Sequence, residues 1–248
     1  GHYIKGMHTL LNAHFDLRNF SQFEIVLKAF EVFEQTPTAQ QYDNFRTHTS
    51  IYINSSKINQ HLMQGTFKQG AALIPIIEKK LNEYALFVDG HRILVFNYKF
   101  ASLHFGNGNY KASIDYLQKI INGPIDLRID LQCYARLLHM MAHYEIGNYD
   151  IMDSLIKSVY RFMAKMKNLT VVEEEIFKFL RNSFNVSPKL LKPELEKLLY
   201  KIKHLEKNRF ETRAFAYLDV ISWVESKVYN KPMGEIIYSK YLQSKRKN

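Results

Sequence analysis

The amino-acid sequence predicts an all-α protein built from stacked pairs of helices. Apolar residues recur at intervals of three and four, as in residues 114–121 and 151–162, and this spacing gives a helix one apolar stripe. Alternation typical of strands is nearly absent. Turn-forming residues divide the chain at regular places, namely Thr36-Pro37, Asp89-Gly90, Asn122-Gly123-Pro124 and Ser187-Pro188. A helix pair of about 40 residues cannot bury its apolar face alone, so the pairs must stack on one another.

The composition excludes several other classes of protein. The chain has 248 residues, of which 46% are hydrophobic, with only 10 Gly and 6 Pro, so disordered and collagen-like classes are excluded. A single cysteine, Cys133, excludes a disulfide framework. No apolar run approaches the roughly 20 residues that cross a bilayer, and we expect a cytoplasmic protein that does not insert into membranes. Gly1-His2 resembles a scar left by tag removal. Whether the natural protein extends beyond it at the N-terminus stays an open question.

One pattern occurs four times along the chain. Each copy begins with a histidine followed by an apolar or aromatic residue: His14-Phe15, His61-Leu62, His104-Phe105 and His143-Tyr144. Four positions after each histidine comes a predicted turn residue: Arg18, Gly65, Gly108 and Gly147. Two positions later an aromatic residue follows: Phe20, Phe67, Tyr110 and Tyr149. Nine and twelve positions after the turn residue the side chains are again apolar: Leu27 and Phe30, Ile74 and Ile77, Leu117 and Ile120, Ile156 and Val159.

This pattern resembles the tetratricopeptide repeat, in which a Gly-x-Tyr turn joins two antiparallel helices. Gly108-Asn109-Tyr110 and Gly147-Asn148-Tyr149 are the closest matches. The copies depart from the family in being longer than its usual 34 residues, in having His where Tyr is more common, and in lacking a consistent closing Pro. The resemblance implies a right-handed superhelical α-solenoid, with four helix pairs over residues 3–167.

The chain beyond residue 167 matches the pattern only weakly. Residues 168–207 are predicted to form a degenerate fifth pair, with helices at 171–184 and 192–204. Residues 208–248 are predicted to contain a long capping helix over 208–229, a short helix up to Tyr241, and a basic tail at Lys245-Arg246-Lys247. The predicted solenoid therefore ends in a C-terminal cap.

The sequence contains no motif for catalysis or for a cofactor. Glycine-rich phosphate loops are absent. His139 and His143 lie one helical turn apart, but no glutamate of a zinc-protease motif lies between them, so packing explains them better than metal binding. Cys133 is predicted to be a buried apolar residue. We therefore expect no catalytic residue, no cofactor, no bound metal and no enzymatic activity.

The resemblance also implies where a partner would bind. In tetratricopeptide arrays the first helix of each pair lines a concave face, and aromatic, amide and hydroxyl side chains there suit an extended peptide. The implied peptide-binding residues are His8, Asn12, Phe15, Tyr52, Ser55, Asn59, Tyr98, Lys99, Ser102, Tyr134, Leu137 and Met141. The expected function is that of a scaffold or adaptor for a protein or peptide. Packing of these tyrosines between repeats remains an equal alternative for each one.

Positive charge is concentrated in the last third of the chain. Residues 1–155 hold 14 basic and 14 acidic side chains, whereas residues 156–248 hold 20 basic and 10 acidic ones. The excess favours nucleic-acid binding as the alternative function, although lysines on solvated helices explain it more simply. The candidate anion contacts are Lys157, Arg161, Lys165, Lys167, Lys189, Lys192, Lys197, Lys201 and Lys203. A third alternative is an enzyme whose site is assembled only by the fold.

Overall fold

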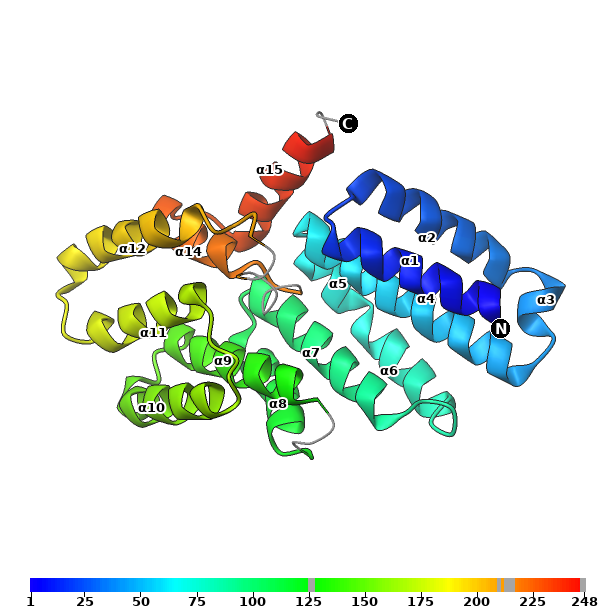
Figure 1. Ribbon diagram of the computed structural model, residues 1–248, viewed down its shortest axis with the longest axis horizontal. Coiled ribbons are helices and arrows are strands. Elements are labelled where there is room, and N and C mark those ends of the chain that lie inside the picture. The colour runs from blue at the N-terminus through cyan, green and yellow to red at the C-terminus, as the bar shows by residue number, and fades with distance from the viewer. Residues whose placement is uncertain (125–127, 209–210, 212–216, 246–248) are drawn as a thin grey trace.

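The structure is a computed structural model that describes residues 1–124, 128–208, 211 and 217–245 (Figure 1). The described residues lie in helices or in the turns that connect them, and these parts of the chain contain no strand. The prediction of an all-α protein is therefore confirmed. No helix within these ranges is long and apolar enough to cross a membrane.

Helix pairs follow one another along the chain (Figure 1). The elements are α1 (His2–Asp16), α2 (Phe20–Glu34), the single-turn α3 (Pro37–Gln40), α4 (Asp43–Gln64), α5 (Phe67–Ala72), α6 (Ile74–Glu83), α7 (Gly90–Gly106), α8 (Tyr110–Ile121), α9 (Ile129–Glu145), α10 (Tyr149–Lys165), α11 (Val171–Ser183), α12 (Pro188–Lys203), α14 (Val220–Tyr229) and α15 (Met233–Lys245). The second helix of the second pair is divided into α5 and α6, and Pro75 lies in the first turn of α6, where its missing N–H is tolerated.

The backbone has a left-handed residue at each of the four predicted turns. Arg18, Gly65, Gly108 and Gly147 have φ angles between 53° and 76°. This conformation ends a helix, and glycine adopts it without a Cβ clash. The aromatic residue two positions later begins the second helix in every copy: Phe20 of α2, Phe67 of α5, Tyr110 of α8 and Tyr149 of α10. The spacing of the pattern therefore marks the turns correctly.

The remaining positions of the pattern form the core. The eight apolar residues nine and twelve positions after the turns are all buried, at 3% exposure or less. They belong to one cluster of buried side chains that extends along the chain from Ile4 to Tyr241. Of the repeated histidines, His61 bonds through Nδ1 to the Thr66 hydroxyl at 2.8 Å, and the Nδ1 of His143 lies 2.9 Å from the Asn148 amide nitrogen. The pattern therefore reflects packing within and between helix pairs.

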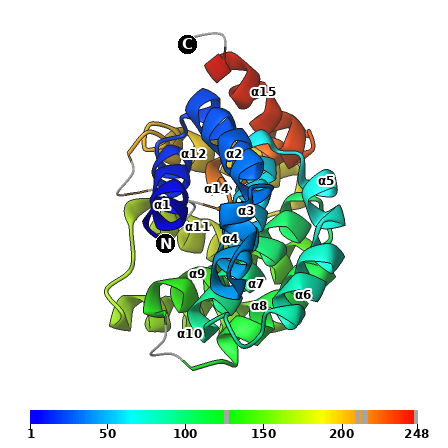
Figure 2. The ribbon, with the colours of Figure 1, turned by 90° about the vertical axis from the view of Figure 1, so that its right-hand side faces the viewer.

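The C-terminal helices return to the beginning of the chain. Helix α15 packs against α2 and α4, and Figure 2 shows it beside α2. The Tyr241 hydroxyl donates to Glu24 Oε1 at 2.5 Å and accepts from Gln64 Nε2 at 3.3 Å. The C-terminal region thus contacts the first two helix pairs as well as the last one.

The predicted capping helix over 208–229 is interrupted in the structure. Glu211 is helical, whereas Asn208 and residues 217–219 are not. Asp219 caps α14 by accepting from the Ser222 N–H at 3.1 Å. Helix α14 therefore begins only at Val220, because a side-chain acceptor at Asp219 satisfies its first free N–H groups. Residues 209–210 and 212–216, and Arg246 and Lys247 of the predicted tail, lie outside the described residues.

Candidate functional site

The side chains that the resemblance assigns to the concave face lie mostly inside the protein. Three are partly exposed: His8, Asn12 and Tyr134. The others are buried: Phe15, Tyr52, Ser55, Asn59, Tyr98, Lys99, Ser102, Leu137 and Met141. A bound peptide could contact the buried residues only after side chains of the protein itself had moved.

Tyr217 covers the centre of this face. Its ring centroid lies 5.7 Å from that of Phe15 on α1 and 5.6 Å from that of Tyr98 on α7. The Lys99 ammonium lies 5.3 Å from the same ring, within the range of a cation–π contact. The place that the sequence suggests for a peptide is therefore occupied by a side chain from the connection between α12 and α14. No spacing indicates this contact, because the repeat pattern does not extend to Tyr217.

Lys99 is a buried amine within this interior. Its Nζ donates to the Ser55 carbonyl and hydroxyl oxygens at 3.3 and 2.5 Å. Burial lowers the pKa of Lys99 to about 7, and the nearby Asp16 opposes this shift. His8 stacks on Tyr52 with ring centroids 3.9 Å apart. Burial and the adjacent cations Lys99 and Arg92 lower the pKa of His8 to about 4. At neutral pH the His8 ring is therefore uncharged, whereas Lys99 is close to the midpoint of its protonation.

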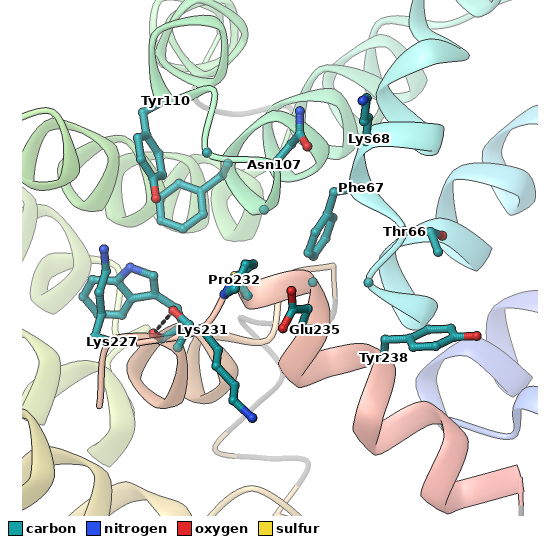
Figure 3. Close-up of a pocket in the computed structure, with 18 of the residues that line it drawn as sticks. Thr66, Phe67, Lys68, Asn107, Tyr110, Lys227, Lys231, Pro232, Glu235 and Tyr238 are labelled. Carbon is teal, nitrogen blue, oxygen red and sulfur yellow. Dashed lines mark hydrogen bonds between the residues drawn. The ribbon is translucent and has the colours of Figure 1, made fainter. Parts of the chain in front are cut away.

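A hollow of about 670 Å³ opens where two repeat turns meet the C-terminal helices (Figure 3). One wall is the turn between α4 and α5, the second is the turn between α7 and α8, and the third is the connection between α14 and α15. We call this hollow the turn groove, and its lining residues come from 65–69, 105–110 and 223–238. Sequence reasoning missed this site, because its third wall lies outside the repeats.

A buried carboxylate bonds three residues that line the turn groove. Glu145, with a side chain only 7% exposed, accepts from Trp223 Nε1 and Lys227 Nζ. Tyr110 also bonds this carboxylate, and burial together with this bond raises the pKa of its hydroxyl. The charge of Lys227 is therefore neutralised. The bond to Glu145 and burial of its ring hold Trp223 in place as an anchor of α14.

Two close contacts at glycines hold the walls of the turn groove together. A Cβ on Gly65 would lie 2.5 Å from the Gly234 carbonyl oxygen, so the α4–α5 turn and the start of α15 touch directly. A Cβ on Gly106 would lie 2.5 Å from the Phe67 ring. Glycine permits both approaches because it has no side chain. The groove is therefore set by packing between its walls.

Charged and aromatic side chains surround the opening of the turn groove. Lys68 and Lys231 are exposed, and no carboxylate within the described ranges pairs with either. Tyr238 is 45% exposed. Figure 3 shows Phe67, Pro232 and Glu235 around the centre, with Lys68 and Lys231 extending toward the outside. The opening has two unpaired cations and one carboxylate, Glu235.

The nine candidate anion contacts fall into two groups. Lys157, Lys197, Lys201 and Lys203 form ion pairs with Asp153, Glu194, Glu175 and Glu225 at distances of 2.6–2.9 Å. For the other candidates, the described part of the chain provides no carboxylate partner: Arg161, Lys165, Lys167, Lys189 and Lys192. The positive charge that is free to attract an anion is therefore smaller than the sequence suggests, and part of it lies at the end of α10.

The pair of histidines and the cysteine carry no metal site in the described residues. The Nε2 atoms of His139 and His143 lie 3.2 Å apart, and burial lowers the pKa of both rings. No third His, Cys, Asp or Glu joins them within the described ranges to form a metal-binding group. Cys133 is buried, as predicted, and burial raises the pKa of its thiol to about 11. A thiol with this pKa stays protonated at neutral pH and is a poor nucleophile.

Comparison with known proteins identifies no relative of this chain. The chain matches no protein-family model, no curated protein and no solved structure. The tetratricopeptide assignment therefore stays a resemblance based on the residues of the four copies.

Proposed function

We propose that this chain is a non-enzymatic scaffold of tetratricopeptide-like helix pairs that binds a short acidic segment of another protein in the turn groove. The observation that carries the proposal is the three-walled hollow of about 670 Å³ between the second and third turns and the C-terminal helices. Hollows of this size that exist before binding are typical ligand sites. A groove whose walls already pack together also avoids part of the cost of ordering them when a ligand binds.

The turn groove is a better binding surface than the face implied by the resemblance. A peptide on that face would have to displace Tyr217 from Phe15 and Tyr98. It would also have to compete for the bonds between Lys99 and Ser55. Removing a buried donor from its acceptor costs the desolvation of both groups. The turn groove requires no such rearrangement.

The charges around the opening favour an acidic ligand. Lys68 and Lys231 are unpaired in the described structure, while the charge of Lys227 is taken up by Glu145. Glu235 is one carboxylate against these two lysines, so the opening keeps a net positive charge. Complementary charge around an interface steers a partner to it and selects among partners. Tyr238 and Pro232 offer apolar surface for a hydrophobic side chain of the segment.

A peptide-display screen tests the proposed function. We expect Asp- and Glu-rich peptides that contain an apolar residue to be enriched, and their affinity to be measurable by fluorescence anisotropy. Lys68→Glu combined with Lys231→Glu should weaken binding of these peptides at least about tenfold, since it reverses the two cations at the opening. The matched control is Lys5→Glu on α1 combined with Lys28→Glu on α2. It changes the net charge of the protein by the same amount as the test variant. Equal weakening by both double variants, or no enriched peptide, would contradict the proposal.

A further inference from the structure

The exposed face of α10 carries a row of positive charge. Lys157, Arg161 and Lys165 lie four residues apart, so they share one side of the helix. Successive members are separated by about 6 Å along the helix axis, at 1.5 Å for each residue. Together with Ser154, Ser158 and Phe162 they line a shallow hollow of about 460 Å³. We call these three cations the α10 row.

Little negative charge compensates the α10 row. None of the residues that line the hollow is acidic. Lys157 pairs with Asp153 at 2.6 Å, but both side chains are more than half exposed, and an exposed pair of this kind is weak. Within the described ranges no carboxylate pairs with Arg161, with Lys165 or with the nearby Lys167. Like charges four residues apart destabilise a helix, and among the three cations only Lys157 has an ion pair in the described structure.

A cation from the neighbouring helix contacts one residue that lines this hollow. The Arg136 guanidinium of α9 lies 4.0 Å from the ring centroid of Phe162, which lines the hollow. Arg136 is held there by hydrogen bonds to Gln132, including one from Nη1 to the backbone carbonyl at 3.1 Å. Arg136 therefore places a further positive charge from α9 against Phe162, in a position fixed by Gln132.

We propose that the α10 row binds the phosphate backbone of nucleic acid without reading its sequence. Arginine, lysine and serine side chains are the common protein donors to backbone phosphates. The spacing of about 6 Å is close to the axial rise over two phosphates of one strand in a duplex, at about 3.4 Å of duplex axis for each. The chain as a whole has a net charge of +10, which attracts a polyanion. This surface is separate from the turn groove, so the inference goes beyond the proposed function and does not depend on it.

Fluorescence anisotropy with labelled mixed-sequence oligonucleotides tests the inference on the full chain. Single-stranded DNA, single-stranded RNA and duplex DNA serve as separate probes between about 50 and 200 mM salt. We expect binding to at least one probe, with an affinity that falls steeply as salt rises, because phosphate contacts release counterions. Arg161→Glu combined with Lys165→Glu should weaken binding at least about tenfold and make the salt dependence shallower by about two phosphate contacts.

Two controls separate this surface from general charge and from the turn groove. Lys5→Glu with Lys28→Glu and Lys68→Glu with Lys231→Glu change the net charge equally and should each leave affinity within about threefold. Circular dichroism should show the same thermal unfolding for all variants, because each changed side chain is exposed. The inference is overturned if no oligonucleotide binds at about 50 mM salt, or if all three double variants lose affinity equally. It is also overturned if only anionic vesicles or phosphopeptides bind.

Discussion

Replacing Gly65 with alanine is expected to lower the free energy of unfolding by about 2–5 kcal/mol. Gly65 has a φ of 71°, and a side chain in this conformation costs about 1–2 kcal/mol. The added Cβ would also lie 2.5 Å from the Gly234 carbonyl oxygen and 3.0 Å from Ile237 Cβ, neither of which is the end of a flexible side chain. Relieving such overpacking costs roughly a further 1–3 kcal/mol. Urea unfolding followed by circular dichroism measures the loss.

Gly108 provides the matched control for this substitution. Its φ is 76°, almost the same as that of Gly65, but a Cβ there would have no neighbour within 4 Å. Gly108→Ala should therefore lower the free energy of unfolding only by the cost of the left-handed backbone conformation, about 1–2 kcal/mol. The difference between the two variants measures how closely α15 contacts the α4–α5 turn. Equal losses would show that this contact is absent in solution, and with it one wall of the turn groove.

The free energy of unfolding should rise with pH between about 7 and 10, and Lys99→Met should remove this rise. Lys99 has a pKa of about 7 in the folded protein, below its ordinary value of 10.5. Between these values the unfolded chain holds one more proton, so stability increases with pH by at most about 1.4 kcal/mol for each pH unit. Below pH 7 the folded protein buries the charged amine, and the full cost of burying this charge is subtracted from the free energy of unfolding.

The effect of Lys99→Met should therefore depend on pH. Near pH 6 the variant is expected to be more stable than the wild type by about 1–4 kcal/mol, since apolar replacements of buried charges are often stabilising. The gain should shrink as the pH approaches 10. Chemical unfolding at several pH values below 10 measures it, because Tyr98 and Tyr217, whose pKa values burial raises, affect stability above that range. Lys28→Met on the exposed surface is the control, and parallel profiles for wild type and Lys99→Met would contradict the assignment.

Much of the helical organisation could be predicted from the sequence. The positions of Arg18, Gly65, Gly108 and Gly147 predict the four turns, and all four have positive φ. The spacing of nine and twelve residues predicts side chains that prove to be buried. These features depend on neighbours a few residues away, because backbone conformation and the 3.6-residue period are local. Local rules were less accurate at the capping helix, which is interrupted at residues 217–219 and continues from Val220 with Asp219 as its cap.

The candidate sites depend on contacts that no local pattern contains. Glu145 and Trp223 are 78 residues apart in sequence, and Tyr241 and Glu24 are 217 apart. Sequence spacing placed Tyr98 and Lys99 on a binding face, but only the fold shows that Tyr217 covers them. It also shows that Lys201 and Lys203 have carboxylate partners on α11 and α14.

The sequence by itself determined that this protein is helical, where its first four pairs turn, and that the eight apolar side chains nine and twelve positions after those turns are in the core. Only the tertiary structure decided which surfaces remain open and which positive charges remain unpaired. The physical reason is that helix formation and apolar periodicity are encoded between near neighbours. The exposure of a side chain and the pairing of a charge depend on whatever distant segment packs against it.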